Sequence, residues 1–452
     1  MKFIDTSALG EGLNRMAKMA LDSGEASSVE EALALFHSYT LHLEVSSDVA
    51  TNVSQQAALL TAANTARRAF LGGVTVNGAA GMACLLPGWH HTDLATVLGA
   101  LGVHTRSRTE GAPIIHIGAG PADAQALLRT ITHGWCGGCV PAVAETASDP
   151  DAFVLSGVIA GAMAVCELFQ KARRSNPAAG RRPVGLSLWD PNADWTMPDA
   201  GRARPLMLPS AAWLIGLGNL GQAFLWSIGM LDYADPGAVT LTLQDFDRIA
   251  ISNDSTSLLT SVDLVGEPKT RAMARWAEAH GFRTRLMERR FAADFRSSAN
   301  DPAVALCGVD NGLARSALED VGFDCILEAG LGAGVSDYLA IRLHSFPQHR
   351  KARNIWAANK AEANVLLAQP AYRQLAANGA DRCGLLQLAG RTVGAPFVGA
   401  IAGALTIAEL VRLANGGPVT AVADLHLRNL DHRTVVRQPA GFGHNPGITL
   451  GR

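Results

Sequence analysis

Short apolar runs alternate with longer stretches of helical periodicity along most of the chain, a pattern typical of α/β proteins. Runs of strand length lie at 74–77, 113–118, 184–188, 211–215, 239–244, 304–308, 326–330 and 422–427. Helices are predicted at 123–132, at 153–169, from the turn near 220 to about 231, and at 395–413. Residues 1 to about 65 are also predicted to be helical, with a capping box at Ser28-Val-Glu-Glu31.

The two most apolar segments, 153–169 and 395–413, are predicted to be buried helices rather than membrane spans. Each carries a glutamate, Glu167 or Glu409. Each also falls short of the roughly 20 uninterrupted apolar residues that cross a bilayer. Their many Gly and Ala residues suit close packing inside a protein.

The same two segments form an internal repeat at an offset of 242 residues. Seven of the fourteen positions from Ser156 to Phe169 are identical to their counterparts. A cysteine precedes each segment and a strand-like run follows each. This context favours two related halves; the alternative is two helices that became similar independently.

A glycine-rich turn opens the second half. Strand 211–215 leads into Gly216-Leu-Gly218-Asn219-Leu-Gly221 and an apolar helix, and the next strand ends at Asp245. Such glycines let the backbone approach a phosphate at a helix N-terminus, and the acid suits ribose hydroxyls. The turn therefore predicts a Rossmann-like nucleotide site. The first half has Gly78-Ala-Ala-Gly81 instead, without a following Asp-x-Asp, so it is predicted to keep the fold without the site.

Composition excludes several classes of protein. The chain has 452 residues, enough for two or three domains, and its 38 Lys+Arg against 40 Asp+Glu give a net charge of -2. That balance argues against a general binder of nucleic acid or of anionic membranes. Seven cysteines and an N-terminus that carries Asp5 and Glu11 predict a cytoplasmic protein with reduced thiols.

Two charged residues of the second half suit ATP chemistry. Lys269 stands at a predicted helix start, and Asp310-Asn311 follows strand 304–308. A lysine can balance the charge that develops at an α-phosphorus, and a carboxylate can hold Mg²⁺. Only six lysines stand against 32 arginines, so a lysine here is unusual for this chain. The alternatives are a solvated Lys269 and an Asp310 that caps the following helix.

The order of these motifs resembles the family of ubiquitin-activating enzymes and their ThiF, MoeB and HesA type bacterial relatives, over about residues 210–430. The family pattern is a glycine turn, Asp-x-Asp, Ser-Asn, an arginine, a lysine at a helix start, and Asp-Asn after the fourth strand. All but the arginine are present, as Gly216-x-Gly218-x-x-Gly221, Asp245-Phe-Asp247, Ser252-Asn253, Lys269 and Asp310-Asn311.

The resemblance implies the architecture and a role for each matching residue. Two ThiF-type halves would form a pseudo-dimer: a helical extension at 1–65, a degenerate half at 66–195 and an active half at 205–452. ATP and Mg²⁺ would be the cofactors. Asp245 would bind ribose, Asp247 and Asn253 would line the ATP site, Lys269 would contact phosphates and Asp310 would hold Mg²⁺. The phosphate turn would comprise Gly216, Gly218, Asn219 and Gly221.

One family arginine is missing, because Ser255 and Thr256 stand where it should fall. Arg248 or Arg271 could replace it. The family also uses an arginine donated from just before the partner subunit's first strand. Arg67-Arg68 occupy the comparable place, so Arg68 is a catalytic candidate; the alternative is that both cap a helix C-terminus.

Cys383 is the candidate nucleophile for a thioester. It follows Arg382 in a loop-like stretch of the predicted crossover segment, about 345–395, and a neighbouring cation favours the reactive thiolate. The alternative is a small buried residue. Cys307 and Cys325 lie in predicted strands, and Cys136-Gly-Gly-Cys139 is a single CxxC where the family's zinc needs two, which leaves a redox role open.

The resemblance implies an activating enzyme that adenylates the C-terminal carboxylate of a ubiquitin-like protein and passes it to a cysteine. A fused inactive-plus-active pair favours a bacterial ubiquitination-like, antiphage-defence setting with a ubiquitin-conjugating-enzyme-like partner and a possible homodimer, without nucleic acid or membrane partners. The alternatives are a sulfur-carrier or peptide adenylyltransferase that forms no thioester, a non-catalytic partner subunit, and a nicotinamide oxidoreductase.

Overall fold

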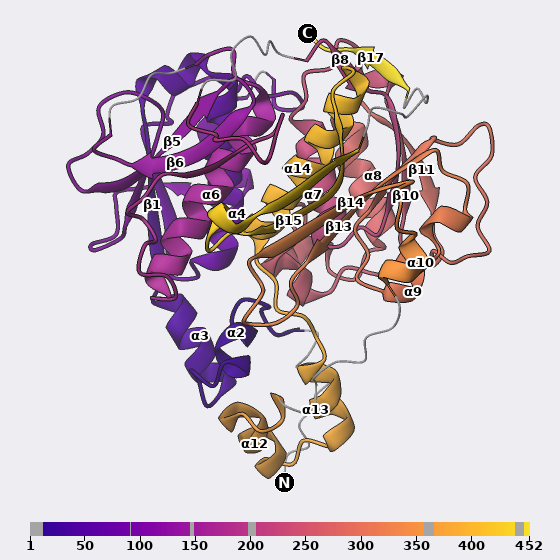
Figure 1. The fold of residues 1–452 in the computed structure, drawn as a ribbon. Helices are drawn as coiled ribbons and strands as arrows, with labels where there is room; N and C mark the ends of the chain where they lie inside the picture. The colour runs from indigo at the N-terminus through magenta and orange to yellow at the C-terminus, as the bar shows by residue number, and fades with distance from the viewer. Residues whose placement is uncertain (1–11, 91, 145–148, 198–204, 357–365, 439–446) are drawn as a thin grey trace.

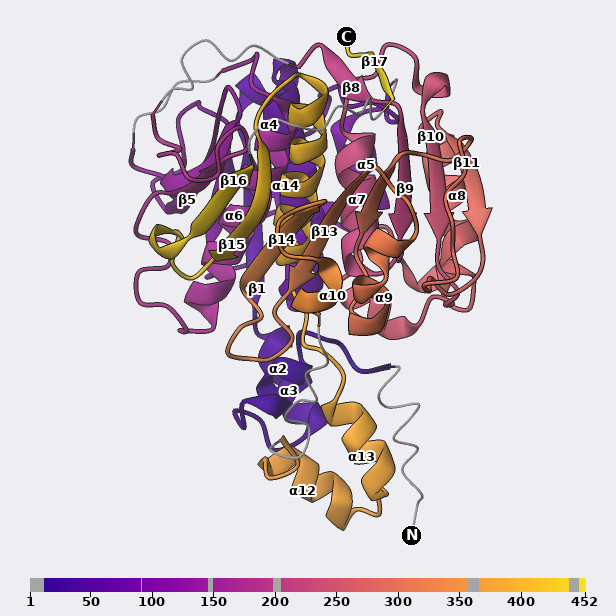
Figure 2. The same ribbon diagram turned by 45° about the vertical axis from the view of Figure 1, so that its right-hand side comes forward.

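The computed structural model describes residues 12–90, 92–144, 149–197, 205–356, 366–438 and 447–452. Two mixed sheets form the body of the molecule, with helices between and around them, and a group of short helices lies at one end (Figures 1 and 2). The predicted α/β class with two Rossmann-like units is confirmed.

The first sheet has seven strands in the order β3-β2-β1-β4-β5-β6-β7. Strands β1 to β5 pair in parallel, and β6 and β7 add antiparallel pairs. The strands are β1 (Thr40–Val45), β2 (Gly73–Asn77), β3 (His104–Thr105), β4 (Ile114–Ile117), β5 (Ala126–His133), β6 (Cys136–Pro141) and β7 (Val184–Ser187).

The second sheet has eight strands in the order β11-β10-β9-β12-β13-β14-β15-β16. Strands β9 to β13 pair in parallel, and the last three strands add antiparallel pairs. The strands are β9 (Ala211–Ile215), β10 (Thr240–Gln244), β11 (Arg283–Met287), β12 (Val304–Cys307), β13 (Cys325–Leu331), β14 (Ala340–Phe346), β15 (Val419–His426) and β16 (Thr434–Gln438). A separate pair joins β8 (Met207–Pro209) to β17 (Ile448–Leu450).

Helices connect these strands. The α-helices are α2 (Lys18–Asp22), α3 (Val29–His37), α4 (Val53–Ala69), α5 (Leu94–Ala100), α6 (Val154–Ala172), α7 (Asn219–Gly229), α8 (Lys269–Ala279), α9 (Gly312–Ser316), α10 (Ala352–Ile355), α12 (Pro370–Ala377), α13 (Arg382–Ala389) and α14 (Pro396–Ala414). Short 3-10 turns are η1 (Ser47–Thr51), η2 (Pro236–Ala238), η3 (Ile251–Ser255), η4 (Val262–Leu264), η5 (Leu318–Asp320) and η6 (Leu430–His432).

The strand orders show that the two units are structural repeats and correct two sequence predictions. Strand β1 corresponds to β9 and strand β2 to β10, so the first unit begins at Thr40 and residues 40–65 are not a helical extension. Leu41, Leu43 and Val45 alternate with His42 and Glu44, which is the period of a strand, but this run is short and the long helix α4 follows it closely. Segment 123–132 is mainly strand β5 rather than a helix, and its Thr-Ile-Thr run explains why.

Four central helices form the contact between the two units, and their glycines explain the sequence repeat. Gly157 and Gly161 of α6 face α4, where an added Cβ would lie 1.8 Å from the Ser54 carbonyl oxygen and 2.1 Å from that of Ala58. At the equivalent place, Gly403 of α14 faces the backbone of α7. Helices α6 and α14 also pack on each other and are buried almost throughout, which explains why helices apolar enough to cross a membrane lie in this core.

The close approach predicts a cost for a single methyl group. Gly157→Ala should lower the free energy of unfolding by about 1–3 kcal/mol because the helices cannot separate without loosening the core. Gly99→Ala is the matched control, since this helical glycine of α5 has nothing within 4 Å of its Cβ position. It should stabilise by up to about 1 kcal/mol through helix propensity. Urea unfolding of both variants measures the difference, and equal midpoints would contradict the packing argument.

Candidate functional site

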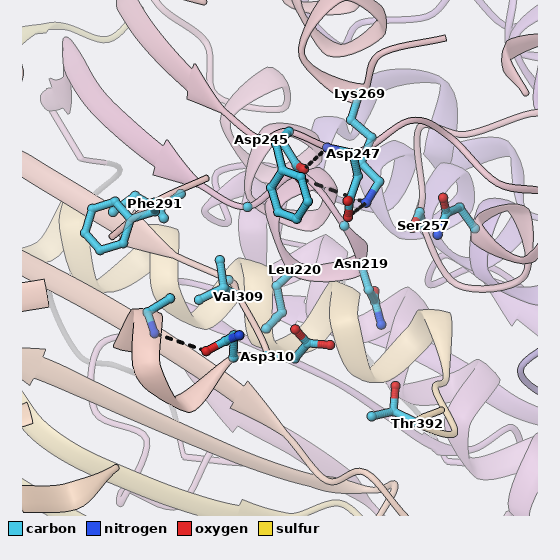
Figure 3. A pocket seen from close by; sticks show the side chains of 18 of the residues that line it. Asn219, Leu220, Asp245, Asp247, Ser257, Lys269, Phe291, Val309, Asp310 and Thr392 are labelled. Carbon is cyan, nitrogen blue, oxygen red and sulfur yellow. Dashed lines mark hydrogen bonds and ion pairs between the residues drawn. The ribbon is translucent and has the colours of Figure 1, made fainter. Parts of the chain in front are cut away.

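A cavity of about 1670 Å³ lies where strands β9, β10, β12 and β13 end. The carboxyl ends of parallel strands are the usual binding edge of an open α/β sheet. Figure 3 shows Lys269, Asp245 and Asp247 together in one part of the cavity, with Asp310 apart from them. The predicted site residues that line it are Gly216, Gly218, Asn219, Asp245, Asp247, Asn253, Lys269 and Asp310.

Each of the three glycines of the turn has a different structural role. Gly216 has φ +84°, a conformation that favours glycine, and an added Cβ would lie 2.7 Å from Val309 Cγ1. At Gly221 a Cβ would lie 2.0 Å from the Gly216 carbonyl oxygen, and Gly221 does not line the cavity. Gly218 has nothing within 4 Å, so its backbone borders open space. Gly218 is thus the glycine that a ligand can approach most closely.

Asp245 fixes the turn to the end of β10. Its Oδ2 accepts a hydrogen bond from the Leu217 N–H at 2.7 Å, and its Oδ1 accepts one from the Asp247 N–H at 2.8 Å. Lys269 reaches the same place from the start of α8, with Nζ 3.0 Å from Asp247 Oδ2 and 4.0 Å from Asp245 Oδ2. Lys269 is only 8% exposed, so the alternative of a solvated surface lysine is wrong.

Asp310 keeps its carboxylate available. Asn311, not Asp310, caps α9: its Oδ1 accepts hydrogen bonds from the N–H groups of Leu313 at 2.9 Å and Ala314 at 3.2 Å. The capping alternative for Asp310 is therefore wrong. Asp310 is exposed to the cavity, and no ion pair is formed with it by the residues that the structure describes.

Five arginines that the sequence analysis did not assign to the site also line the cavity: Arg15, Arg290, Arg315, Arg353 and Arg391. The Arg15 N–H donates to Ser255 Oγ at 3.1 Å, which places the segment before α2 beside η3. Burial and the nearby Arg391 lower the pKa of Arg15 to about 10, and Asp310 opposes this shift. Arg15 is therefore still a cation at neutral pH. Arg15 lies ahead of strand β1, with α2 and α3 between them, so it is not at the position just before a strand where a donated arginine was expected.

Arg68 has a structural place instead. It is 2% exposed, and its guanidinium donates to the carbonyl oxygens of Ser257 at 3.2 Å, Leu258 at 3.1 Å and Thr260 at 2.8 Å. Arg67 pairs with Asp254 at 2.9 Å. Neither arginine lines the cavity, so the catalytic prediction for Arg68 is wrong. The loop that follows η3 directs these carbonyl groups toward α4. Arg68 joins the two units there.

The two residues proposed as substitutes for the missing family arginine lie in different places. Arg271 is exposed and pairs with Glu288 at 2.8 Å, outside the cavity. Arg248 lines the cavity, although one of its nitrogens already donates to the Gly266 carbonyl oxygen at 2.7 Å. Arg248 is therefore one of the arginines that make the cavity wall cationic beside Lys269.

Several buried polar atoms in the cavity wall have no partner among the described residues. They are Asn219 Oδ1, Ser252 Oγ and Ser257 Oγ. Buried polar groups are nearly always satisfied, so such atoms point to a polar ligand or water. Together with the open backbone at Gly218, the cations and the free carboxylate, they fit a nucleotide with its magnesium ion.

Comparison with known proteins identifies the family. Residues 40–188 match the BilD N-terminal domain and residues 208–417 the BilD C-terminal domain. The bacterial E1-like protein BilD of Collimonas sp. (strain OK412) is 39% identical over 447 residues, which cover 97% of each chain. The protein belongs to the BilD family. Its first matched domain begins at the first residue of strand β1.

E. coli MccB and TcdA are among the solved structures to which this chain is similar. E. coli MccB superposes with a TM-score of 0.32 at 12% identity, over 51% of this chain and 62% of MccB, so the chain spans less than two thirds of MccB. E. coli tRNA N6-threonylcarbamoyladenosine dehydratase, TcdA, gives 0.29 at 16% identity, over 45% of this chain and 85% of TcdA.

In this BilD family member the first unit has closed its equivalent sheet end with its own carboxylate. Asp48 of η1 accepts hydrogen bonds from the N–H groups of Ala119 at 3.1 Å and Gly120 at 3.3 Å, just beyond β4. Burial acts to raise the pKa of Asp48, but hydrogen bonds from Ser46 and from these N–H groups lower it below its usual value. An internal carboxylate thus links the turn after β1 to the turn after β4, at the sheet end that corresponds to the cavity of the second unit.

The six cysteines whose side chains the structure describes are all buried. Cys307 and Cys325 are buried, and burial, with nearby Glu328 and Glu409 respectively, raises the pKa of each thiol to about 12. The predicted core role is supported. Cys139 is fully buried in β6 with a pKa raised well above its usual value, first by burial and then by Glu167. No cluster of metal-ligating side chains occurs among the described residues.

Cys383 lies in a helix rather than in a loop. It is the second residue of α13, which is capped by Asp381 through a hydrogen bond from the Gly384 N–H at 2.9 Å. The Ala-Asp-Arg sequence before it suggested a loop because Asp is a cap residue, and the helix it opens is short. After α13 the chain runs through Gly390 directly to Arg391 in the cavity wall.

Proposed function

We propose that this protein adenylates the C-terminal carboxylate of a ubiquitin-like protein with MgATP. The observation that carries the proposal is the meeting of Lys269, Arg15 and Asp310 around one glycine turn. These charges suit the triphosphate, the charge that develops at the α-phosphorus, and a divalent cation. The family's E1-like name supports the same reaction class.

The chemistry joins a carboxylate oxygen to the α-phosphorus and releases pyrophosphate. Mg²⁺, held by Asp310 and by phosphate oxygens, would neutralise charge on the phosphates. Lys269 stands beside Asp247 and can turn toward the α-phosphate, while Arg15 approaches from the opposite unit of the chain. Asp245 keeps the turn in place and still has acceptor capacity for ribose hydroxyls. Each cation serves the same purpose, the stabilisation of the pentacovalent transition state.

An apolar rim beside the polar end supports a peptide-like substrate. Phe246, Ile251 and Leu313 line the cavity and are 51%, 54% and 80% exposed. Exposed apolar side chains that gather at a cavity mark a binding surface. A flexible protein C-terminus could lie along this rim with its carboxylate directed toward Lys269.

The competing functions account for less of the site. The non-catalytic interpretation was motivated by the missing arginine, and Arg15 and Arg391 now supply cations there. A nicotinamide oxidoreductase has no use for Lys269 and Asp310 together. An adenylyltransferase for a sulfur carrier or a small peptide uses the same cavity and differs only in the fate of the adenylate.

Thioester formation is the step that separates these two adenylating functions. We propose Cys383 as the nucleophile because the other six cysteines are buried. Its helix belongs to the segment that returns to the cavity at Arg391. A ubiquitin-conjugating-enzyme-like protein would then receive the acyl group, and by resemblance the setting would be a cytoplasmic, antiphage ubiquitination-like system.

Removing either charge of the nucleotide end should stop adenylation. Lys269→Ala and Asp310→Ala should each lower carrier-dependent ATP–pyrophosphate exchange by about 10²–10³ because each loses a charge directed at the transition state. Arg271→Ala is the matched control, since Arg271 lies outside the cavity and pairs only with Glu288. Wild-type exchange in both cavity variants would refute the site assignment.

The two candidate donated arginines should respond differently. Arg15→Ala should lose about 10²-fold in exchange with an unchanged unfolding midpoint. Arg68→Ala should lower the free energy of unfolding by about 2–4 kcal/mol, because it leaves several buried carbonyl groups without donors. Exchange rates and thermal unfolding of both purified variants test this. A stable Arg15→Ala protein with full activity would contradict the role of Arg15.

Cys383→Ala should separate adenylation from transfer. With ATP and the ubiquitin-like protein, the wild type should form a covalent adduct that dithiothreitol cleaves, since a thiolate attacks an acyl adenylate readily. The alanine variant should lose the adduct and keep pyrophosphate exchange. An adduct that persists in the variant would place the nucleophile elsewhere. Exchange without any adduct in the wild type would favour the adenylyltransferase that stops at the adenylate.

A further inference from the structure

A group of four short helices lies beyond the open ends of the two sheets and is built from two distant segments of the chain. Helices α2 and α3 come from the N-terminal segment, and α12 and α13 from the segment that follows α10 (Figures 1 and 2). Helix α12 contacts α2 and α13. We call α2, α3, α12 and α13 the helical appendage.

Three buried polar side chains hold the appendage together. Lys18 Nζ lies 2.5 Å from Asp22 Oδ2, and the Tyr372 hydroxyl donates to Asp22 Oδ1 at 2.6 Å. Lys18 Nζ also donates to the Ala389 carbonyl oxygen at 3.4 Å, so one ammonium links α2 to the end of α13. Lys18, Asp22 and Tyr372 are 1%, 4% and 1% exposed.

Burying an ion pair and a hydroxyl costs free energy that would not be needed if these side chains only held helices together. Both side chains are buried, and this burial lowers the pKa of Lys18 and raises that of Tyr372. Apolar side chains of similar volume often replace a buried ion pair without loss of stability, whereas the ion pair fixes one geometry. The geometry fixed here is that of two neighbouring chain segments.

Those two segments carry two of the arginines that line the cavity. Arg15 lies three residues before Lys18, and Arg391 lies two residues after Ala389. The hydrogen bond from Lys18 to Ala389 therefore links the two chain segments within three residues of Arg15 and Arg391, which carry like charges. Arg391 acts to lower the pKa of Arg15, so the two guanidinium groups are close enough to repel each other. An anion between them would remove that repulsion.

We propose that Lys18, Asp22 and Tyr372 are positioning residues that set Arg15 and Arg391 for a phosphate chain, and that nucleotide binding in turn tightens α12 and α13. The inference rests on the proposed ATP site. Because coupling between two sites is reciprocal, loosening the buried contacts should weaken nucleotide binding, by at most the factor through which the nucleotide tightens them. The helix that carries Cys383 thereby becomes sensitive to the state of the cavity.

Hydrogen–deuterium exchange of the full chain with and without MgATP tests the inference. In the wild type, MgATP should slow amide exchange about tenfold both at the glycine turn and in α12 and α13. In Tyr372→Phe the glycine turn should stay protected at saturating MgATP, while α12 and α13 lose most of their protection. The dissociation constant for MgATP should rise about fivefold.

Two further variants keep the outcome clear. Tyr233→Phe removes a buried hydroxyl that donates to the Pro209 carbonyl oxygen at 3.0 Å, far from the appendage, and should behave as the wild type. The double variant Lys18→Met with Asp22→Leu replaces the ion pair by apolar groups and should repeat the effect of Tyr372→Phe in a folded protein.

The outcomes distinguish the inference from the function on which it rests. Protection of the glycine turn without protection of α12 and α13 in the wild type would overturn the coupling and leave the ATP site intact. Full protection of both helices in Tyr372→Phe and in the double variant would show that these contacts are not the link. Absence of protection anywhere would overturn the ATP site and the inference with it.

Discussion

The close approach of four central helices is the constraint on which the rest of the molecule depends. Glycines at equivalent places on α6 and α14 let these helices lie directly on the backbones of α4 and α7. That contact sets where α7 begins, and the start of α7 is the glycine turn. It also brings the end of α4 to the η3 loop, where Arg68 joins the units. One packing arrangement thus places both the binding turn and the interface that supports it.

The two units of the duplicated fold differ at the corresponding ends of their sheets. In the second unit, backbone donors and cations surround an open cavity, and Asp310 keeps a free carboxylate there. In the first unit, Asp48 of the turn after β1 accepts hydrogen bonds from the backbone N–H groups that follow β4. The first unit nevertheless serves the site, because Arg15 comes from the segment that precedes its first strand. We infer that the first unit contributes a cation to the cavity of the second unit and supports that cavity, and that it is not itself a second nucleotide site.

Local sequence patterns predicted most residues of the cavity, whereas residues that reach the cavity through contacts between distant segments were missed. The turn at Gly216, the lysine at a helix start and Asp310 each stand at the end of an apolar strand, so their meeting follows from the order of the strands. Arg15 and Arg391 come together only through the helical appendage, which no local pattern reveals. Arg68 had the right place in sequence, but carbonyl groups of residues 257–260 bind its guanidinium. Strand β1 carries the strand period in Leu41, Leu43 and Val45, but it is short and lies close to the longer helix α4, so the whole stretch was predicted to be helical.

The central claim is that one chain with two related units offers one nucleotide site. Isothermal titration of MgATP, without any carrier protein, tests this most directly because it counts sites on the intact chain. The account predicts a single class of site with one nucleotide bound per chain. Two nucleotides per chain would show that Asp48 does not close the first unit, and no binding at saturating MgATP would contradict the assignment of the cavity.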